Sequence, residues 1–209
     1  KYNVAIGISG LFVLFGLIAG ANSIISGHHQ VYAVTRDIPW GLLIAAYVFF
    51  VVTSTGLCIV SSLGHVFGFM AIITIVSGFV VIAFEIANAY RMPIWNVLGA
   101  NPSSNIWWMG TLYGAYLFFM LIEFVLLQKE NHKVATMFGL AGLLTGVAAH
   151  SNLGAVFGLL NGREFWHGPY MPIYFITSAA MSGCVAVIFF TYLAYKANGW
   201  KMSDDMKTS

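Results

Sequence analysis

Long apolar segments alternate with short polar connections along this chain of 209 residues. A transmembrane helix needs about 20 mainly apolar residues, and the pattern predicts six such helices. They cover residues 4–25, 40–62, 65–89, 106–127, 134–150 and 172–195. The run from Trp40 to Ala89 is too long for one helix, so we place a break between Ser61 and Gly64. Residues 151–161 are too short to cross a bilayer, and we expect a half-helix or an interfacial segment there.

Composition narrows the class of protein. Hydrophobic residues make up 59% of the chain and charged residues only 8%, whereas a soluble domain carries about 25% charged residues. No basic face exists to neutralise phosphates, which excludes nucleic acid as a partner. Cys58 and Cys184 lie in apolar runs without a CxxC pattern, so we expect no metal site, iron–sulfur cluster or c-type haem in this chain. The expected fold class is an all-α polytopic membrane protein surrounded by lipid.

Basic residues predict how the helices are oriented. Connections on one side hold six lysines and those on the other hold three arginines: Lys1, Lys129, Lys133, Lys196, Lys201 and Lys207 against Arg36, Arg91 and Arg163. Short loops rich in Lys and Arg stay in the cytoplasm, so we place the N-terminus there. The opposite side carries the longer connections, residues 26–39, 90–105 and 151–171. Long connections on one face predict a docking surface for an extracytoplasmic partner.

Glu85 is the ionisable residue of most interest, about five residues before the outer end of the third span. Ionisable groups within a bilayer are expensive and are therefore functional candidates. Helical spacing puts Gly78 and Thr74 on its face, so we expect this face to look into the bundle. Two interpretations remain open. Glu85 belongs to a packing network with Arg91 or Asn88, or it takes part in proton or quinone chemistry.

Small or polar residues recur every seven positions along the second span: Trp40, Tyr47, Ser54 and Ser61. Packing between helices in lipid explains most of such a stripe. Tyr47 is the exception, because its hydroxyl is expected about two turns below the outer surface. That depth is close to the depth of Glu85.

Histidines and a second glutamate lie near the ends of other spans. His65 and Glu123 fall in the inner half, where they predict either a proton route from the cytoplasm or a solvated interfacial pair. Haem iron takes histidine ligands, and a transmembrane b-type haem needs two of them at one depth. His65 and His150 fall in opposite leaflets, which disfavours such a haem. Pairing of His150 with His28 or His29 stays open.

Three stretches in order along the chain resemble the NrfD/PsrC family, the membrane subunits of polysulfide reductase-like complexes. They read WGLLIAAYVFFVVTSTGLCIVSSLGHVFG, FEIANAYRMPIWNVLGANPSSNIWWMG and HSNLGAVFGLLNGREFWHGPYMPIYFITSAAMSGCVAV. Glu85 and Arg91 take the family's acidic and arginine positions, although the family more often has a compact Asp-x-Gly-Arg-Pro there. The wording STGLCIVSSLGHVFG is most similar to the sulfite-reductase-associated (DsrP) and Hmc-type members.

The resemblance implies an arrangement of eight or ten helices in two four-helix bundles. TSTGLCIV in the second span echoes AMSGCVAV in the sixth, as expected if the two bundles are repeats. Residues 1–128 would then form the first bundle with a quinone site. Residues 129–209 would begin the second bundle and end in a polar tail. The chain is therefore expected to be a partial stretch that lacks at least two C-terminal helices.

The function implied by the resemblance is that of a quinone-reactive subunit in a bacterial or archaeal inner membrane. Such subunits bind menaquinone or ubiquinone near the extracytoplasmic face and hold no redox centre of their own. They exchange electrons with a ferredoxin-like iron–sulfur subunit, or with a multihaem cytochrome or another membrane subunit. Glu85 is the expected proton acceptor. The expected quinone-binding residues are Asn22, His28, His29, Trp40, Tyr47, Arg91, Trp107 and Trp108.

Three other functions stay open. A structural anchor would hold redox subunits on the membrane without binding quinone, and it predicts no polar cluster at one depth. A haem-b anchor would show inward-facing histidines. A secondary transporter would show broken helices around a midplane site, and residues 151–161 are the candidate break.

Overall fold

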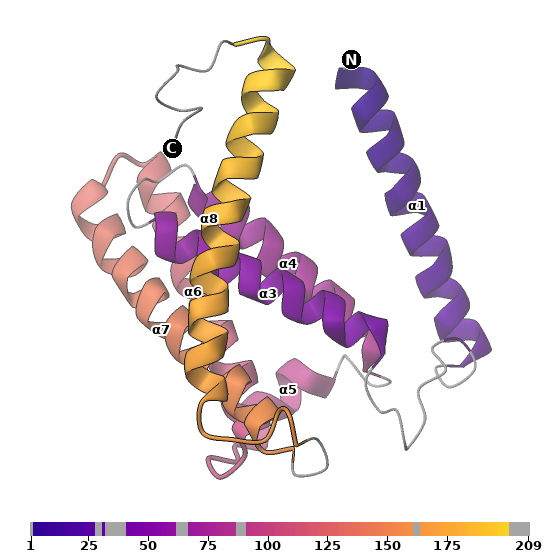
Figure 1. Cartoon of the computed structure of the whole chain (residues 1–209), viewed down its shortest axis with the longest axis vertical. Coiled ribbons are helices and arrows are strands. Elements are labelled where there is room, and N and C mark those ends of the chain that lie inside the picture. The colour runs from indigo at the N-terminus through magenta and orange to yellow at the C-terminus, as the bar shows by residue number, and fades with distance from the viewer. Residues whose placement is uncertain are drawn as a thin grey trace.

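The computed structural model describes residues 2–27, 31, 41–61, 67–86, 91–160 and 164–200. Within these ranges the chain forms seven helices and no strands (Figure 1). They are α1 (Tyr2–Ser26), α3 (Leu42–Ser61), α4 (Gly68–Glu85), α5 (Arg91–Leu98), α6 (Asn105–Gln128), α7 (His132–Gly158) and α8 (Met171–Asn198). Six of the described helices, all except α5, are long and apolar enough to cross a membrane. The six predicted spans and the all-helical fold class are therefore confirmed.

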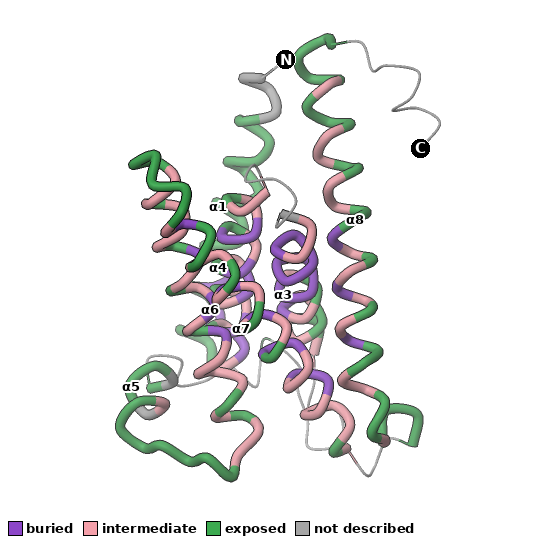
Figure 2. The backbone as a smooth tube through the Cα atoms, turned by 90° about the vertical axis from the view of Figure 1, so that its left-hand side faces the viewer, coloured by how far each residue is buried: buried purple, intermediate pink, exposed green. Residues whose placement is uncertain are grey.

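Five helices, α3, α4, α6, α7 and α8, pack into one body, and α1 stands beside it (Figure 1). A continuous run of eight α3 residues, 51–58, is buried, because apolar or small side chains cover every face of this helix. Figure 2 shows the buried segments gathered on α3 and on the faces that surround it, whereas most of α1 is exposed. The short helix α5 lies at one end of the body, which we call the α5 end.

Two glycines let α3 and α8 cross in close contact. A Cβ atom on Gly56 would overlap the Ala179 carbonyl oxygen, and a Cβ atom on Gly183 would overlap the Gly56 carbonyl oxygen. Small residues allow helix backbones in lipid to approach this closely. The crossing joins the two segments that echo each other in sequence, and it packs α8 directly on α3 (Figure 1). The division of the chain at residue 128 stays a prediction.

A tight turn joins α6 to α7 and fixes which residues of the two helices meet. The Asn131 side chain caps α7 by accepting a hydrogen bond from the Val134 N–H at 3.4 Å. Three α7 glycines then receive α6 side chains of larger size: Gly139 faces Glu123, Gly142 faces Met120 and Gly146 faces Tyr116. The members of each pair lie a similar number of residues from the turn, as expected for antiparallel neighbours.

The structure corrects the prediction for residues 151–161. Instead of a half-helix or interfacial segment, α7 continues unbroken to Gly158. The polar side chain of Asn152 at the supposed break is accommodated inside the bundle, because its Nδ2 donates to the Asn105 carbonyl of α6 at 2.7 Å. Gly154 gives further support, because a Cβ there would lie 2.6 Å from the Met171 carbonyl oxygen at the start of α8. Polarity marked a helix–helix contact rather than a helix end.

A second difference concerns the stretch that was predicted to be a loop. Residues 91–98 form α5, a helix of eight residues. Pro93 lies in its first turn, where the N–H that proline lacks would have no partner within the helix. A helix therefore tolerates this proline, although its presence favours a loop when the sequence is considered alone. The helix before α5, α4, ends at Glu85, and the next residue, Ile86, has an extended backbone with ψ 117°.

Candidate functional site

Glu85 is the last residue of α4 and lies at the α5 end of the body. Its side chain is only 9% exposed, and Oε2 has no hydrogen-bond partner among the residues that the structure describes. Gly78 is also buried, so this face of α4 does look into the bundle. Buried polar atoms in proteins are nearly always paired, and an unpaired one calls for an explanation.

Tyr47 packs against the same face of α4. A Cβ atom on Gly78 would lie 3.7 Å from the Tyr47 ring, and Gly78 is two helical turns before Glu85. Tyr47 itself is 4% exposed. Tyr47 and Tyr113 of α6 belong to the same buried cluster of side chains. The structure thus places Tyr47 between the Glu85 face of α4 and the interior of α6.

A buried hydrogen bond between Tyr113 and His150 was not identified from the sequence. The Tyr113 hydroxyl and His150 Nδ1 are 3.0 Å apart, and neither residue is exposed. The opposite nitrogen, His150 Nε2, has no partner among the described residues, and the ring lies 5.8 Å from that of Phe175 on α8. The signal was present in the sequence, because both residues lie at similar distances from the α6–α7 turn.

One turn further along α6, Tyr116 bonds to Ser54 of α3, and Ser54 in turn bonds to α4. Its hydroxyl is 2.9 Å from Ser54 Oγ, and Ser54 Oγ donates to the Ala71 carbonyl at 2.7 Å. Ser54 belongs to the stripe of small and polar residues in the predicted second span. The packing role expected for that stripe is confirmed at this position.

The paired tryptophans of α6 attach α5 and the following loop to the body. Trp107 Nε1 donates to the Asn96 carbonyl at 2.7 Å, and Trp108 Nε1 donates to the Pro102 carbonyl at 2.9 Å. The Asn96 side chain also donates from Nδ2 to Thr111 Oγ1 at 2.9 Å. Both indole N–H groups therefore bind backbone at the α5 end, close to where the sequence placed the mouth of a site.

An apolar cavity of about 320 Å³ lies between α4, α5 and α6. Its walls are Phe79, Ile82 and Ala83 from α4, Pro93 and Asn96 from α5, and Gly110 and Gly114 from α6. Ile82 is one turn before Glu85, so the cavity reaches the α5 end of the body. Ligand sites are commonly apolar hollows with a few polar groups, and Asn96 is the polar side chain of this wall.

A larger groove of about 570 Å³ is lined by residues of α3, α4 and α8. Three of its hydroxyl groups donate to carbonyls of their own helices, those of Thr53, Thr74 and Thr177. These groups are satisfied locally, so the groove presents a mainly apolar surface.

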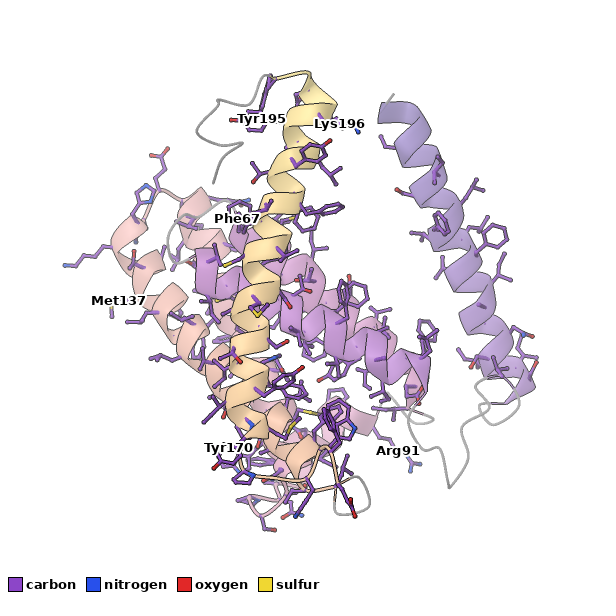
Figure 3. All side chains as sticks on the ribbon, viewed as in Figure 1. Phe67, Arg91, Met137, Tyr170, Tyr195 and Lys196 are labelled. Atoms are coloured by element: carbon purple, nitrogen blue, oxygen red, sulfur yellow. The ribbon has the colours of Figure 1, made fainter. Side chains whose placement is uncertain are left out.

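The other predicted site residues are spread over the molecule. Asn22 is exposed on α1 and accepts a hydrogen bond from Ser26 Oγ at 3.1 Å. Arg91 begins α5 and is exposed at the same end as Tyr170, whereas Lys196 lies at the opposite end (Figure 3). Glu123 packs on Gly139 towards that opposite end. His28, His29, Trp40 and His65 lie outside the described residues.

The geometry bears on two of the alternative functions, the transporter and the haem anchor. Because α7 is continuous to Gly158, the helix break expected of a transporter does not occur at residues 151–158. His150 Nδ1 contacts Tyr113, but Nε2 has no partner among the described residues and His28 and His29 lie outside them, so the haem anchor stays open. Within the described ranges no three His, Cys, Asp or Glu side chains are grouped as metal ligands.

Comparisons with known proteins agree with the helical architecture. The chain is 31% identical over 175 residues to an Hdr-like menaquinol oxidoreductase integral membrane subunit from Archaeoglobus fulgidus, covering 76% of this chain and 44% of that protein. It is 23% identical over 209 residues to a selenate reductase subunit from Mesobacillus selenatarsenatis, covering 75% of this chain and 49% of that protein. The chain therefore spans about half the length of these curated relatives. No solved structure matches it significantly.

The family assignment rests on a match to most of the chain. The sequence profile of the family described as "Polysulphide reductase, NrfD" matches residues 30–207. This range includes the Glu85 face of α4, the cavity and the Tyr113–His150 pair. The chain is a multi-pass membrane protein that belongs to the NrfD family of polysulphide reductase membrane subunits.

Proposed function

We propose that this chain is the quinone-reactive membrane subunit of a respiratory oxidoreductase complex. It exchanges electrons between menaquinone or ubiquinone and an iron–sulfur partner on the extracytoplasmic face. The observation that carries the proposal is Glu85, a carboxyl group buried at the α5 end of α4 with one oxygen unpaired among the described residues. The naming of an Archaeoglobus relative as a menaquinol oxidoreductase subunit supports the choice of a quinone.

Quinol oxidation explains why a carboxylate would be kept in this position. Each quinol releases two protons with its two electrons, so a base is needed beside the ring. A charged or polar group in the membrane interior is costly and persists where it serves a function. Glu85 is that base in our proposal, and a residue with such a role contributes about 10²–10⁴-fold to a rate.

Other residues of the α5 end fit the same proposal. Tyr47 would donate a hydrogen bond to the quinone, together with Asn22, His28, His29 or Trp40. Arg91 would hold the Glu85 region in place. Trp107 and Trp108 would keep the mouth of the site assembled through their hydrogen bonds to α5 and to the loop that follows it. On the other side of the membrane, His65 and Glu123 would supply a proton route.

The α5 end is the docking surface in this proposal. With the N-terminus in the cytoplasm, α5 and the α7–α8 connection face the extracytoplasmic side. Phe165 and Tyr170 in that connection are 88% and 78% exposed. A partner subunit carrying iron–sulfur clusters would cover these aromatic side chains and bring its nearest cluster towards Glu85.

The test uses the complex purified in detergent from its native membrane. Saturable quenching of a fluorescent hydroxyquinoline N-oxide, a quinol analogue, measures binding, and oxidation of menadiol measures turnover. Glu85→Gln keeps the shape of the side chain and removes the base, so we expect turnover to fall about 100-fold in an assembled complex. Glu130→Gln, an exposed carboxyl in the turn between α6 and α7 at the opposite end, is the matched control and should leave turnover unchanged.

One result would overturn the proposal, and a second would remove only the role given to Glu85. If the wild-type complex shows no saturable binding of the quinol analogue, the chain is a structural anchor. If Glu85→Gln turns over like the wild type, the quinone proposal stands but Glu85 is not its base.

A further inference from the structure

Two glycines of α6 stand out because, in the part of the chain that the structure describes, no helix backbone packs on them. Gly110 and Gly114 have the four-residue spacing that usually marks a close contact between membrane helices. Among the described residues, a Cβ atom on Gly114 would meet nothing within 4 Å, and the atoms nearest to one on Gly110 belong to the Asn96 side chain, at 3.1 Å. Instead of closing a helix contact, the two glycines form a flat wall of the cavity between α4, α5 and α6.

The cavity opens towards the lipid rather than towards the core. Gly114 and Ala83 on its walls are exposed, and the neighbouring Val80 and Phe118 are 50% and 58% exposed. Gly114 is nine residues into the 24-residue helix α6, or about 14 Å along its axis. An exposed surface at that depth of a membrane-spanning helix faces acyl chains. A ligand would therefore enter sideways, between α4 and α6.

Asn96 gives this apolar cavity a fixed polar group. One amide hydrogen of Asn96 is directed to Thr111 Oγ1, and Thr111 in turn donates to the Trp107 carbonyl at 3.0 Å. Trp107 completes the ring by donating to the Asn96 carbonyl. A primary amide carries a second N–H and an acceptor oxygen. The Asn96 side chain is therefore held in one place and still has hydrogen-bonding capacity for a ligand in the cavity.

We propose that this cavity is the seat for the ring of a lipid-soluble quinone that enters from the bilayer. The flat ring lies against Gly110 and Gly114, and the Asn96 amide donates to one carbonyl oxygen. A volume of about 320 Å³ is at the small end of ligand sites. It takes the ring but not a long isoprenoid tail, which stays in lipid. This assignment rests on the proposed function, and Ile82 of the cavity wall is one turn before Glu85. Tyr47 does not line this cavity, so in this assignment Asn96 takes its place as the hydrogen-bond donor to the ring.

The test fills the cavity without disturbing the packing of the protein. Gly114→Leu puts a branched side chain into space where no atom stands within 4 Å. Gly10→Leu puts the same side chain on an equally open, exposed face of α1 and is the control. In the purified complex we expect Gly114→Leu to weaken binding of the hydroxyquinoline N-oxide at least tenfold, and Gly10→Leu to leave it unchanged.

A second variant guards against failure of the first to fold. Ala83→Leu obstructs the cavity from the α4 wall, and we expect the same loss of binding. If the wild type binds and both cavity variants bind equally well, the cavity assignment is wrong while the proposed function stands. If the wild type itself does not bind, the proposed function is what fails.

Native mass spectrometry separates a quinone from a phospholipid as the occupant. Our assignment predicts that the N-oxide adds one ligand mass to the wild type and none to Gly114→Leu. If the wild type instead retains one phospholipid that Gly114→Leu lacks, and N-oxide binding is equal in the two, the cavity holds an acyl chain. That result would overturn the assignment.

Discussion

Glycines serve two different purposes in the helix contacts of this protein. At the α3–α8 crossing and along the α6–α7 contact, each glycine is covered by atoms of the neighbouring helix. At the boundary between α4 and α6, no described residue covers Gly114, and the atoms nearest to Gly110 belong to the Asn96 amide side chain. We call the first two the closed interfaces and the third the open interface. The spacing of glycines in the sequence does not distinguish them, because what decides is whether another helix approaches.

The two kinds of interface also differ in what offsets the cost of glycine. In a helix, glycine is about 1 kcal/mol less favourable than alanine in water. At the closed interfaces, close packing of backbones and side chains offsets that cost. At the open interface, no described protein atom packs on Gly114, so no contact in the described part of the chain offsets that cost. A bound ring supplies the offset in our assignment of the cavity.

Substitution at the α3–α8 crossing should have the largest effect. Gly56→Leu forces the helices apart, because Gly183 and the Ala179 carbonyl occupy the space of the new side chain. Overpacking costs 1–3 kcal/mol and more where backbone must move, so we expect a loss above about 3 kcal/mol. Thermal unfolding in detergent measures it. Gly16→Leu on the open face of α1 should unfold like the wild type, and equal melting of the two variants would contradict the close crossing.

A matched pair of substitutions compares the stability of the two kinds of interface. The substitution at the closed interface should lower the free energy of unfolding by an intermediate amount, and the one at the open interface should leave it unchanged. At Gly146 a Cβ atom would lie 3.1 Å from the Tyr116 ring, so Gly146→Leu displaces Tyr116 from Ser54. We expect that variant to lose about 1–3 kcal/mol. Gly114→Leu should stay within about 0.5 kcal/mol of the wild type. The same unfolding measurement compares them, and equal losses would mean that the interfaces do not differ.

The sequence was sufficient to predict the spans, because membrane helices have long apolar runs that can be counted. The sequence was misleading at two places, where an asparagine and a proline have a structural role other than the one that they usually indicate. Asn152 follows the predicted end of a helix, yet its amide binds the Asn105 carbonyl across an interface. Pro93 falls in a predicted loop, yet it lies in the first turn of α5.

The candidate site was predictable in part. Glu85 and Tyr47 were identified from depth and helical face, and the structure buries both. Whether they bind quinone stays a prediction. The cavity could not be predicted, because a glycine pair four residues apart indicates close packing as readily as open space. The Tyr113–His150 contact was within reach, since antiparallel helices joined by a short turn pair residues at similar distances from it.

The smallest effect is expected at the Tyr113–His150 pair of the closed α6–α7 interface. Hydrogen bonds between membrane helices contribute about 0.6 kcal/mol on average and about 1.7 kcal/mol at most in double-mutant cycles. Tyr113→Phe, His150→Leu and the double variant form such a cycle, and we expect a coupling energy in this range. Pairing Tyr113→Phe with Thr136→Val, an exposed position near the start of α7, should give additive losses. A Tyr113–His150 coupling no larger than that control would mean that the 3.0 Å contact contributes nothing to holding α6 against α7.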